Sequence, residues 1–396
     1  MKKKILFVTY DLGVDGASKS LINILEQIDY DRYDVDLFLC LQRGMFMKFI
    51  PEKVNVLPTI KILSALTMPI KSSLISLLKQ KHFTLFFPRL RYPINYKFKM
   101  SLANAAQQVW SAFSEYVPPI ENRYDAVISY QDHWIKYFMA EKTKSNVKIA
   151  WNHCNLSKTE ININVESKYI SLIDHWVTIS DECRHVLESM FPDSKQKIKV
   201  IENIISPSVI RHMAHQVNAF SDDNFKGKRI VTLGRLAHEK GIDIAIKACN
   251  LVVKAGYDIR WYVIGDGPQR EEIEKLIKKY NLEDRFILLG INSNPYPYVA
   301  AADIYVQPSR TEGKSIAIEE AKALSKPIIV TNYQTVYDQI KHKKTGVIVP
   351  ISEDGIAKGI KEVLNKPELT KEISKNLSYY SGNENEVNKL YELIGG

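Results

Sequence analysis

The sequence predicts an α/β protein of two domains, each built on a doubly wound parallel sheet. Three observations lead to this prediction. The chain has 396 residues, which is long for a single hydrophobic core. Short apolar runs typical of buried strands alternate along it with amphipathic stretches typical of helices. Hydrophobic residues make up 45% of the chain, and the ordinary Gly and Pro counts exclude a mainly disordered protein.

We place the first domain at residues 1–206, the second at 207–378, and a helix that returns to the first domain at 379–396. The four cysteines are scattered and form no C-x-x-C pair, so we expect reduced thiols and no zinc site. The apolar run at residues 5–8 is too short for the core of a signal peptide. No apolar run approaches the ~20 residues that a membrane-spanning helix needs.

The first domain opens with a strand–helix–strand pattern. We expect a strand at residues 5–9, a helix at 17–27 and a strand at 35–40, which predicts a parallel sheet. Gly13 and Gly16 lie in the loop after the first strand, where a flexible turn and a ligand-binding loop are both possible interpretations.

Residues 53–114 form a basic region without a single Asp or Glu. The region holds nine Lys and Arg residues, which equals the net charge of +9 of the whole chain. Its apolar residues recur at helical spacing, and this combination suits an anionic lipid surface, where each basic residue adds on the order of 1 kcal/mol. The alternative is a solvated basic helix pair whose apolar face belongs to the core. The residues that we assign to a membrane surface are Lys71, Lys79, Lys81, Arg89 and Arg91. No nucleic-acid-binding motif accompanies the charge, so we expect no nucleic acid partner.

Further strands of the first domain are expected at residues 124–130, 148–151 and 174–179, and a last strand leads into the linker within 197–207. His153 directly follows one of them, at the sheet edge where α/β proteins bind ligands. A purely structural histidine is the alternative at this position.

The second domain begins with a strand at residues 229–233. Arg235 and Lys240 follow it and flank a turn, so they can neutralise a diphosphate, Arg as a planar fork and Lys as a point charge. The next strand, at 261–264, ends in Gly265-Asp266-Gly267-Pro268. This is not the G-x-G-x-x-G fingerprint, so we expect no dinucleotide cofactor.

A strand at residues 304–306 is followed by a loop with Glu312 and then by a helix that carries Glu320. Free backbone N–H groups at the start of this helix attract anions. If most of the interval is helical, the two carboxylates are about 12 Å apart along the axis, which suits one extended ligand. The alternative is an ordinary amphipathic helix with solvated glutamates.

An ordered set of motifs surrounds these residues. It consists of GRLAHEKG at 234–241, VIGDGP at 263–268, LGINSNPYPYVAAADIYVQPS at 289–309, KPIIVT at 326–331 and TGVIVP at 345–350. With the Glu312 and Glu320 pair, this set resembles the retaining nucleotide-sugar glycosyltransferases of family 4, of the bacterial cell-envelope polysaccharide type. The resemblance covers roughly residues 230–350 and implies the GT-B architecture, two Rossmann-like domains that face a central cleft.

The resemblance also implies roles for individual residues. Arg235 and Lys240 would neutralise the departing diphosphate, Glu312 would orient the sugar, and His153 would lie near the reacting centre. The implied donor-binding residues are Gly234, Gly265, Gly290, Asn292, Gly313, Lys314, Ser315, Ile316 and Glu320, the last of them on the ribose. Gly13 and Gly16 would approach the diphosphate or the acceptor.

The function expected from this reading is retaining transfer of a sugar from a nucleotide-diphosphate sugar, a UDP-sugar in the first instance. The acceptor would be lipid-linked or a glycan, and the protein would be cytoplasmic and peripheral at the inner face of the membrane. We expect no metal and no other cofactor. One alternative is a non-catalytic or chaperone subunit of a glycosyltransferase complex, because Gly313-Lys314-Ser315 replaces the family's usual Gly-Phe-Gly. A sugar-nucleotide epimerase and a plain lipid-binding protein are two further alternatives.

Overall fold

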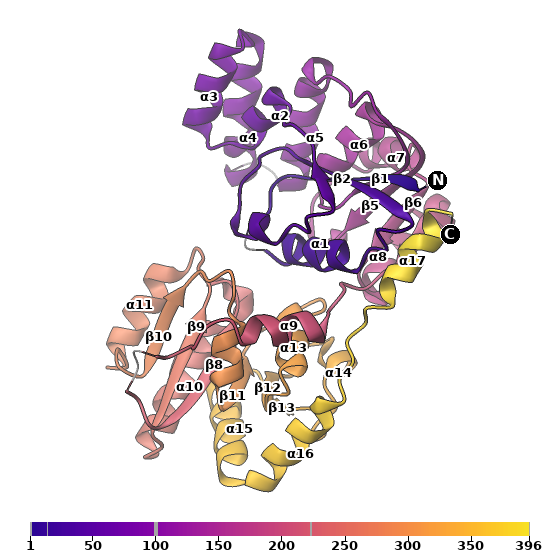
Figure 1. Cartoon of the computed structure of the whole chain (residues 1–396). Helices are drawn as coiled ribbons and strands as arrows, with labels where there is room; N and C mark the ends of the chain where they lie inside the picture. The colour runs from indigo at the N-terminus through magenta and orange to yellow at the C-terminus, as the bar shows by residue number, and fades with distance from the viewer. Residues whose placement is uncertain (1, 14, 99–101, 222–223, 396) are drawn as a thin grey trace. The chain divides into compact units, whose positions relative to one another are not determined.

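The computed structural model describes residues 2–13, 15–98, 102–221 and 224–395 (Figure 1). The chain forms two compact units: unit 1 consists of Met1–Ile204 and Glu384–Gly396, and unit 2 of Ile205–Asn383. The sequence placed the corresponding boundaries at 206/207 and 378/379, close to these positions. Residues 99–101 of the basic region lie outside the described residues.

Unit 1 is built on a seven-stranded parallel sheet in the order β3-β2-β1-β4-β5-β6-β7. Its strands are β1 (Lys3–Thr9), β2 (Tyr33–Leu39), β3 (Val54–Val56), β4 (Arg123–Ser129), β5 (Lys144–Asn152), β6 (His175–Thr178) and β7 (Ile198–Val200). Four consecutive residues of β1, Ile5 to Val8, are fully buried, as expected of a central strand with both faces covered.

The helices of unit 1 cover both faces of this sheet. They are α1 (Gly16–Gln27), α2 (Lys61–Thr67), α3 (Ile70–Lys79), α4 (Phe86–Phe98), α5 (Leu102–Phe113), α6 (Ile135–Lys142), α7 (Ile163–Ser171), α8 (Asp181–Met190) and α17 (Glu386–Leu393). α1 begins one residue earlier than the sequence predicted, because the Asp15 side chain accepts a hydrogen bond from the Ser18 N–H at 2.9 Å and caps the helix. α17 brings the C-terminus back beside the N-terminus: the Tyr391 ring stacks on Tyr33 at 4.9 Å, and Lys3 Nζ donates to the Gly395 carbonyl (Figure 1).

Unit 2 is built on a six-stranded parallel sheet in the order β10-β9-β8-β11-β12-β13. Its strands are β8 (Lys228–Leu233), β9 (Ile259–Ile264), β10 (Phe286–Gly290), β11 (Ile304–Gln307), β12 (Ile328–Thr331) and β13 (Val347–Val349). Its helices are α9 (Pro207–Ala214), α10 (Ile242–Lys254), α11 (Arg270–Lys279), α12 (Tyr296–Ala301), α13 (Ile316–Ala323), α14 (Val336–Gln339), α15 (Glu353–Asn365) and α16 (Pro367–Ser378).

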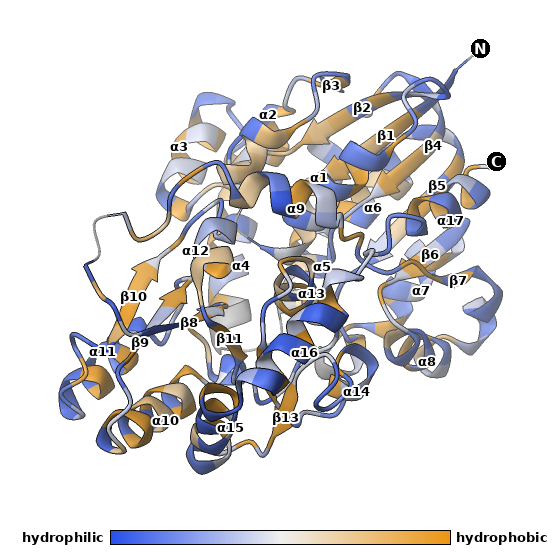
Figure 2. Ribbon diagram, turned by 60° about the horizontal axis from the view of Figure 1, so that its bottom comes forward, coloured by the Kyte–Doolittle hydropathy of each residue, from blue (hydrophilic) through white to orange (hydrophobic). Residues whose placement is uncertain are grey.

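Each unit is therefore a doubly wound parallel sheet with helices on its faces, the architecture that the sequence predicts. Figure 2 shows the strands of both sheets mainly in hydrophobic colours, whereas most helices have one hydrophobic and one hydrophilic side. None of the helices within the described ranges combines the length and the apolar character that a membrane span requires.

Candidate functional site

The candidate site of unit 2 lies at the carboxyl end of its sheet, where the strand order reverses. The chain builds β8, β9 and β10 toward one edge and then returns to place β11 on the other side of β8. Doubly wound proteins bind ligands at such a switch point. The loop after β8 carries Arg235 and Lys240, and the loop after β11 carries Glu312. The fold thus brings together residues that are more than 70 positions apart in the sequence.

The Glu312 carboxylate is held by three donors. Lys240 Nζ lies 2.8 Å from its Oε1 and 2.7 Å from its Oε2. Ser309 Oγ donates to Oε1 at 2.7 Å, and Gln307 Nε2 donates to the same oxygen at 3.1 Å. An ionised carboxylate offers about four acceptor positions, two on each oxygen. Oε1 is therefore fully occupied, whereas Oε2 accepts from Lys240 alone among the described residues and keeps one position for a ligand.

A second ion pair joins the same two loops. Arg310 follows β11, and its guanidinium donates to both carboxylate oxygens of Asp243, in the first turn of α10, at 2.8 and 2.7 Å. Burial acts to raise the pKa of the Asp243 carboxyl, but the hydrogen bonds and charge of Arg310, with two backbone N–H groups, lower it below its ordinary value. The pair clamps the loop of Lys240 against the loop of Glu312.

The two loops also touch through their backbones at Gly241. This residue has a φ of 64°, and a Cβ added to it would lie 2.1 Å from the Pro308 carbonyl oxygen. Only glycine combines this left-handed conformation with so close an approach. The glycine that ends GRLAHEKG is therefore required by the packing of the loops.

The loops after β8, β9 and β10 are joined by main-chain hydrogen bonds. The Gly234 N–H donates to the Ile264 carbonyl at 3.1 Å, and the Gly265 N–H donates to the Gly290 carbonyl at 2.8 Å. A Cβ on Gly265 would lie 2.0 Å from the Gly234 carbonyl oxygen, so the loops approach each other as closely as backbones can. Three glycines predicted to bind the donor thus lie side by side.

Two further predicted residues lie in these loops. Arg235 is exposed, and within the described part of the chain its guanidinium pairs with no carboxylate, so it can meet an anion. Asn292 Oδ1 accepts from the Asn294 N–H at 2.9 Å and shapes the loop after β10.

The start of α13 is fixed by a side chain from α14. The Ser315 N–H donates to Gln339 Oε1 at 2.8 Å, and Gln339 Nε2 donates back to the Ser315 carbonyl at 2.9 Å. The main-chain N–H of Ser315 is thus engaged inside the unit, so any donor contact of this residue falls to its side chain. Gly313 is different, because a Cβ on it would meet no described atom within 4 Å. Lys314 and Ile316, the first residue of α13, are both half-buried.

Glu320 is only 3% exposed, and its Oε1 accepts a hydrogen bond from the Tyr296 hydroxyl at 3.0 Å. α13 begins at Ile316, so the interval from Glu312 to Glu320 consists of a short loop followed by helix, as the sequence predicts. The neighbouring Glu319 has a structural environment, with bonds from Lys322, Gln339 and Tyr380.

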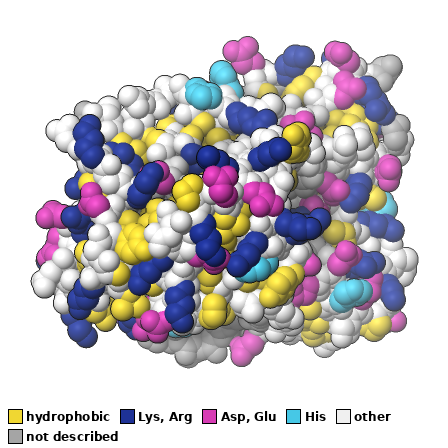
Figure 3. All heavy atoms as spheres, turned by 90° about the horizontal axis from the view of Figure 1, so that it is seen from below, with side chains coloured by type: hydrophobic (Ala, Val, Ile, Leu, Met, Phe, Trp, Pro, Cys, Tyr) yellow, Lys and Arg dark blue, Asp and Glu magenta, His cyan; other side chains and the backbone are white. Residues whose placement is uncertain are grey.

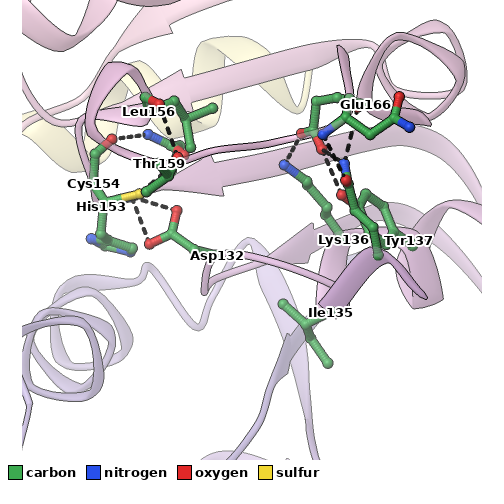
Figure 4. A network of polar contacts seen from close by, with 12 residues as sticks. Asp132, Ile135, Lys136, Tyr137, His153, Cys154, Leu156, Thr159 and Glu166 are labelled. Carbon is green, nitrogen blue, oxygen red and sulfur yellow. Dashed lines mark hydrogen bonds and ion pairs between the residues drawn. The ribbon is translucent and has the colours of Figure 1, made fainter. Parts of the chain in front are cut away.

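The predicted residues of unit 1 lie near its own switch point, between β1 and β4. The main-chain N–H of His153 donates to both carboxylate oxygens of Asp132, at 3.1 and 3.3 Å (Figure 4). Its Nε2 lies 3.0 Å from the Tyr130 carbonyl oxygen. A carbonyl can only accept, so Nε2 carries a proton. Burial lowers the pKa of His153 more than the Asp132 charge raises it, so the ring is neutral at pH 7 and Nδ1 is an acceptor.

The loop after β1 does not depend on the two glycines that the sequence singles out. Gly16 is the first residue of α1, and a Cβ on Gly13 would make only ordinary contacts at 3.4 Å, to Asp11 and Asp15. The glycine that this loop requires is Gly44, because a Cβ there would lie 1.9 Å from the Leu12 carbonyl oxygen.

One residue of the predicted membrane surface belongs to the interior. Arg89 is 5% exposed, and its Nε donates to Ser73 Oγ at 3.0 Å, while its guanidinium also reaches the carbonyls of Ala65 and Met68. Burial lowers its pKa. Arg89 ties α4 to the α2–α3 connection and is removed from the surface assignment. The other four residues are exposed: Lys71, Lys79, Lys81 and Arg91.

Sequence reasoning missed several residues that hold the site together. Arg310 and Asp243 are each within three residues of a predicted residue, but they are 67 positions apart and their pairing has no sequence signal. Gln307 and Ser309 precede Glu312 directly and could have been proposed as its supports. Asp132 was not missed, because its place just past a predicted strand makes it a weaker candidate in the sequence itself.

Comparisons with known proteins bear on unit 2 and on the fold. Residues 217–378 match the family described as "Glycosyl transferases group 1". The chain is 30% identical over 150 residues to an alpha-D-kanosaminyltransferase of Streptomyces kanamyceticus, covering 37% of this chain and 39% of that protein. It is 28% identical over 183 residues to the N-acetylgalactosamine-N,N'-diacetylbacillosaminyl-diphospho-undecaprenol 4-alpha-N-acetylgalactosaminyltransferase of Campylobacter jejuni, covering 46% and 48%.

The chain thus spans less than half the length of these two curated relatives. Among solved structures, it resembles Anabaena HepE in complex with UDP and glucose, with a TM-score of 0.68, 17% identity and coverage of 100% of both chains. The two parallel-sheet units and this likeness establish the GT-B fold, as the sequence predicts. The match to the family falls within unit 2.

Proposed function

We propose that this protein is a retaining glycosyltransferase that takes its sugar from a nucleotide-diphosphate sugar, a UDP-sugar in the first instance. The observation that carries the proposal is the Glu312 site. A carboxylate, a lysine ammonium and an exposed arginine all follow strands that meet at the switch point of unit 2, and this arginine has no carboxylate partner among the described residues. The match of this unit to a glycosyltransferase family supports the proposal.

The cations would act on the leaving group. When the glycosidic bond to the diphosphate breaks, negative charge develops on the phosphate oxygens, and preorganised cations lower the barrier most when they lie where that charge forms. We assign this role to Arg235 and Lys240. The exposed backbone of Gly313 and the start of α13 would contribute partial positive charge.

Lys240 would exchange partners during binding. In this structure its ammonium bonds both oxygens of Glu312. An arriving diphosphate competes for the ammonium, and the partial release of Oε2 gives Glu312 an acceptor for a sugar hydroxyl. Ser309 and Gln307 would keep Oε1 in place meanwhile, so the carboxylate stays oriented. We assign Glu320 to the ribose, with Tyr296 orienting its carboxylate.

We further propose a lipid-linked or glycan acceptor, met at the inner face of the membrane. The name of the Campylobacter relative describes a lipid-diphosphate acceptor, and the exposed basic residues of unit 1 suit an anionic surface. By the resemblance, unit 1 would receive the acceptor, and the neutral His153 would lie near the reacting sugar. Metal independence is part of the proposal, and activity that survives exhaustive chelation would support it.

A panel of sugar nucleotides tests the donor assignment. Purified protein is incubated with UDP-, GDP-, ADP- and TDP-sugars, and release of the nucleoside diphosphate is measured with the thermal shift that each compound causes. We expect one class of sugar nucleotide to stabilise the protein and to be hydrolysed by it. Both effects should be smaller in Arg235→Ala. The product anomer, read by NMR, checks retention of configuration.

Two results would count against the proposal. Stabilisation without turnover, even with membrane extracts as an acceptor source, would favour the non-catalytic subunit. No shift with any sugar nucleotide would overturn the donor site.

A further inference from the structure

Helices α4 and α5 enclose a groove that the proposed reaction does not use. Its volume is about 190 Å³, it opens to solvent, and it lies within unit 1. Side chains from both helices line it, among them Phe87, Arg91, Tyr92, Ala105, Val109 and Ala112. The walls are mainly apolar, and Arg91 supplies a positive charge at the exposed end of the lining.

The outward face of α4 beside the groove is apolar. Phe87 is 69% exposed and Ile94 is 51% exposed, and Leu90 and Arg91 lie between them. These positions are spaced by three and four residues, so they form one stripe along the helix. A helix in water normally presents polar residues on this stripe, and a contiguous exposed apolar patch indicates a binding surface.

The neighbouring α3 has the same character. Its outward stripe is made of Lys71, Ile75, Leu78 and Lys79, all exposed, and Phe83 follows it in the short turn before α4. The mouth of the groove therefore belongs to a wider surface in which exposed apolar side chains alternate with basic ones.

The charge of this surface indicates the kind of occupant. Basic and acidic side chains are interspersed on the molecular face drawn in Figure 3. Residues 53–114, in contrast, contain no acidic residue to mix with their nine basic ones. A second copy of the chain in a twofold contact would place this acid-free surface against itself, and like charges would oppose the contact. An anionic ligand with an apolar tail is complementary in both respects.

We propose that the α4–α5 groove binds the hydrocarbon or prenyl chain of a phosphate-bearing lipid, with Arg91 paired to the phosphate. A groove of about 190 Å³ is smaller than the pockets of ~300–1,000 Å³ that hold a drug-sized molecule, so it takes one end of such a chain and leaves the rest against the exposed apolar stripe of α4. The Arg91 guanidinium matches phosphate oxygens as a planar fork. That the lipid is the sugar acceptor rests on the proposed function; lipid binding itself does not.

Soluble short-chain probes test the groove without a membrane. Binding of farnesyl phosphate to the full chain is measured by calorimetry, with dihexanoyl phosphatidylglycerol, farnesol and inorganic phosphate as comparisons. We expect farnesyl phosphate to bind at least 10-fold more tightly than farnesol or phosphate alone. A preference for farnesyl phosphate over the phosphatidylglycerol would identify a prenyl lipid as the source, and the reverse preference an ordinary phospholipid.

Three variants separate the parts of the site. Ala112→Trp fills the groove and should abolish binding of both lipid probes. Arg91→Gln should lower the affinity for farnesyl phosphate by about 10-fold and leave the affinity for farnesol unchanged. Lys254→Gln removes one exposed charge in unit 2, outside this surface, and should bind farnesyl phosphate as the wild type does. Circular dichroism of each variant checks that the chain is folded.

The outcomes distinguish this proposal from the proposed function. The groove is not the lipid site if Ala112→Trp or Arg91→Gln binds farnesyl phosphate with wild-type affinity. Equal affinity of the wild type for phosphate and farnesyl phosphate would also overturn this assignment. The lipid assignment would also fail if the protein bound only an acidic peptide, or only a second copy of itself, seen as oligomerisation. UDP binding is measured on the same samples: if it is absent while farnesyl phosphate binds, the donor assignment fails and the groove stands.

Discussion

At the scale of single residues, the four donor-site side chains do not have equivalent environments. Lys240 donates to both carboxylate oxygens of Glu312, so these two side chains neutralise each other. Arg235 is exposed, whereas Glu320 is buried and accepts a hydrogen bond from Tyr296. Loss of one residue should therefore affect binding or turnover according to what it touches.

We predict that Arg235→Ala and Lys240→Ala each lower transfer by about 10²-fold or more, because each removes a charge from the departing diphosphate. Glu312→Gln should mainly lower turnover, and Glu320→Gln should mainly weaken binding of the free nucleoside diphosphate. Steady-state kinetics and titration with the diphosphate measure the two effects separately. Unchanged diphosphate affinity in Glu320→Gln would remove the ribose role.

A second prediction compares the two arginines of α4. Arg89→Gln should lower the free energy of unfolding by about 2–3 kcal/mol, since it leaves buried carbonyls and Ser73 without their donor. Arg91→Gln should change it by less than about 0.5 kcal/mol, because Arg91 is exposed. Denaturant unfolding of both variants gives the comparison, and equal losses would show that the two side chains share one environment.

The composition of the basic region placed both arginines on the membrane surface, but composition does not show which side chains are buried. The sequence gives charge and helical spacing, but burial depends on which face of α4 meets the α2–α3 connection. Ser73 and Arg89 are 16 residues apart and meet only through that packing. The same reason hid the Arg310–Asp243 pair, whereas Arg235, Lys240 and Glu312 were found because local motifs contain them.

At the scale of elements, the strands were the most predictable part of the structure. The predicted strands at 5–9, 261–264 and 304–306 correspond to β1, β9 and β11, because strands buried on both faces are continuous apolar runs. Loops were less predictable. The segment from Glu312 to Ser315 is held by Ser309, three residues before Glu312, and by two distant side chains, Lys240 in the loop after β8 and Gln339 of α14.

The Arg310–Asp243 ion pair leads to a prediction about how stability depends on pH. The native pKa of Asp243 is lowered, so the Arg310 pair stabilises the fold above the unfolded pKa of about 3.9 and loses this contribution as the pH falls through the native value. Asp243→Asn should therefore be less stable than the wild type at pH 7, by at most about 1 kcal/mol for a half-exposed pair. The difference should decrease as the pH falls through the lowered native pKa of Asp243.

Chemical unfolding at a series of pH values measures this difference. Arg310→Lys is the matched control, since it keeps the charge and loses the two-pronged bond. A difference between the wild type and Asp243→Asn that does not decrease as the pH is lowered would mean that the pair's charge is not its source.

At the scale of the whole molecule, the sequence identified the two doubly wound units and the uneven distribution of charge between the basic region and the rest of the chain. The residues outside 53–114 carry no net charge, since that region holds the whole excess of nine. The exposed basic residues of the region lie among exposed apolar ones on α3 and α4. This arrangement predicts how the protein meets a membrane.

We predict that the full chain binds anionic vesicles and that the attachment has two components. The electrostatic component falls off within a Debye length, about 8 Å at physiological ionic strength, and should weaken as salt is added. The apolar component, from side chains such as Phe83 and Phe87, should leave a salt-resistant remainder on vesicles already bound. Co-sedimentation with neutral and anionic vesicles at low and high salt measures both.

Charge reversal at the four exposed residues, Lys71, Lys79, Lys81 and Arg91, should abolish vesicle binding and leave nucleotide affinity unchanged, because the donor site lies in the other unit. Phe83→Ser with Phe87→Ser should instead reduce only the salt-resistant part, since it removes no charge. Reversal of four lysines of unit 2, such as Lys254, Lys275, Lys278 and Lys361, is the matched control and should leave vesicle binding intact. If the wild type ignores anionic vesicles at low salt, the basic region is a solvated face, and the acceptor has to be sought among soluble glycans.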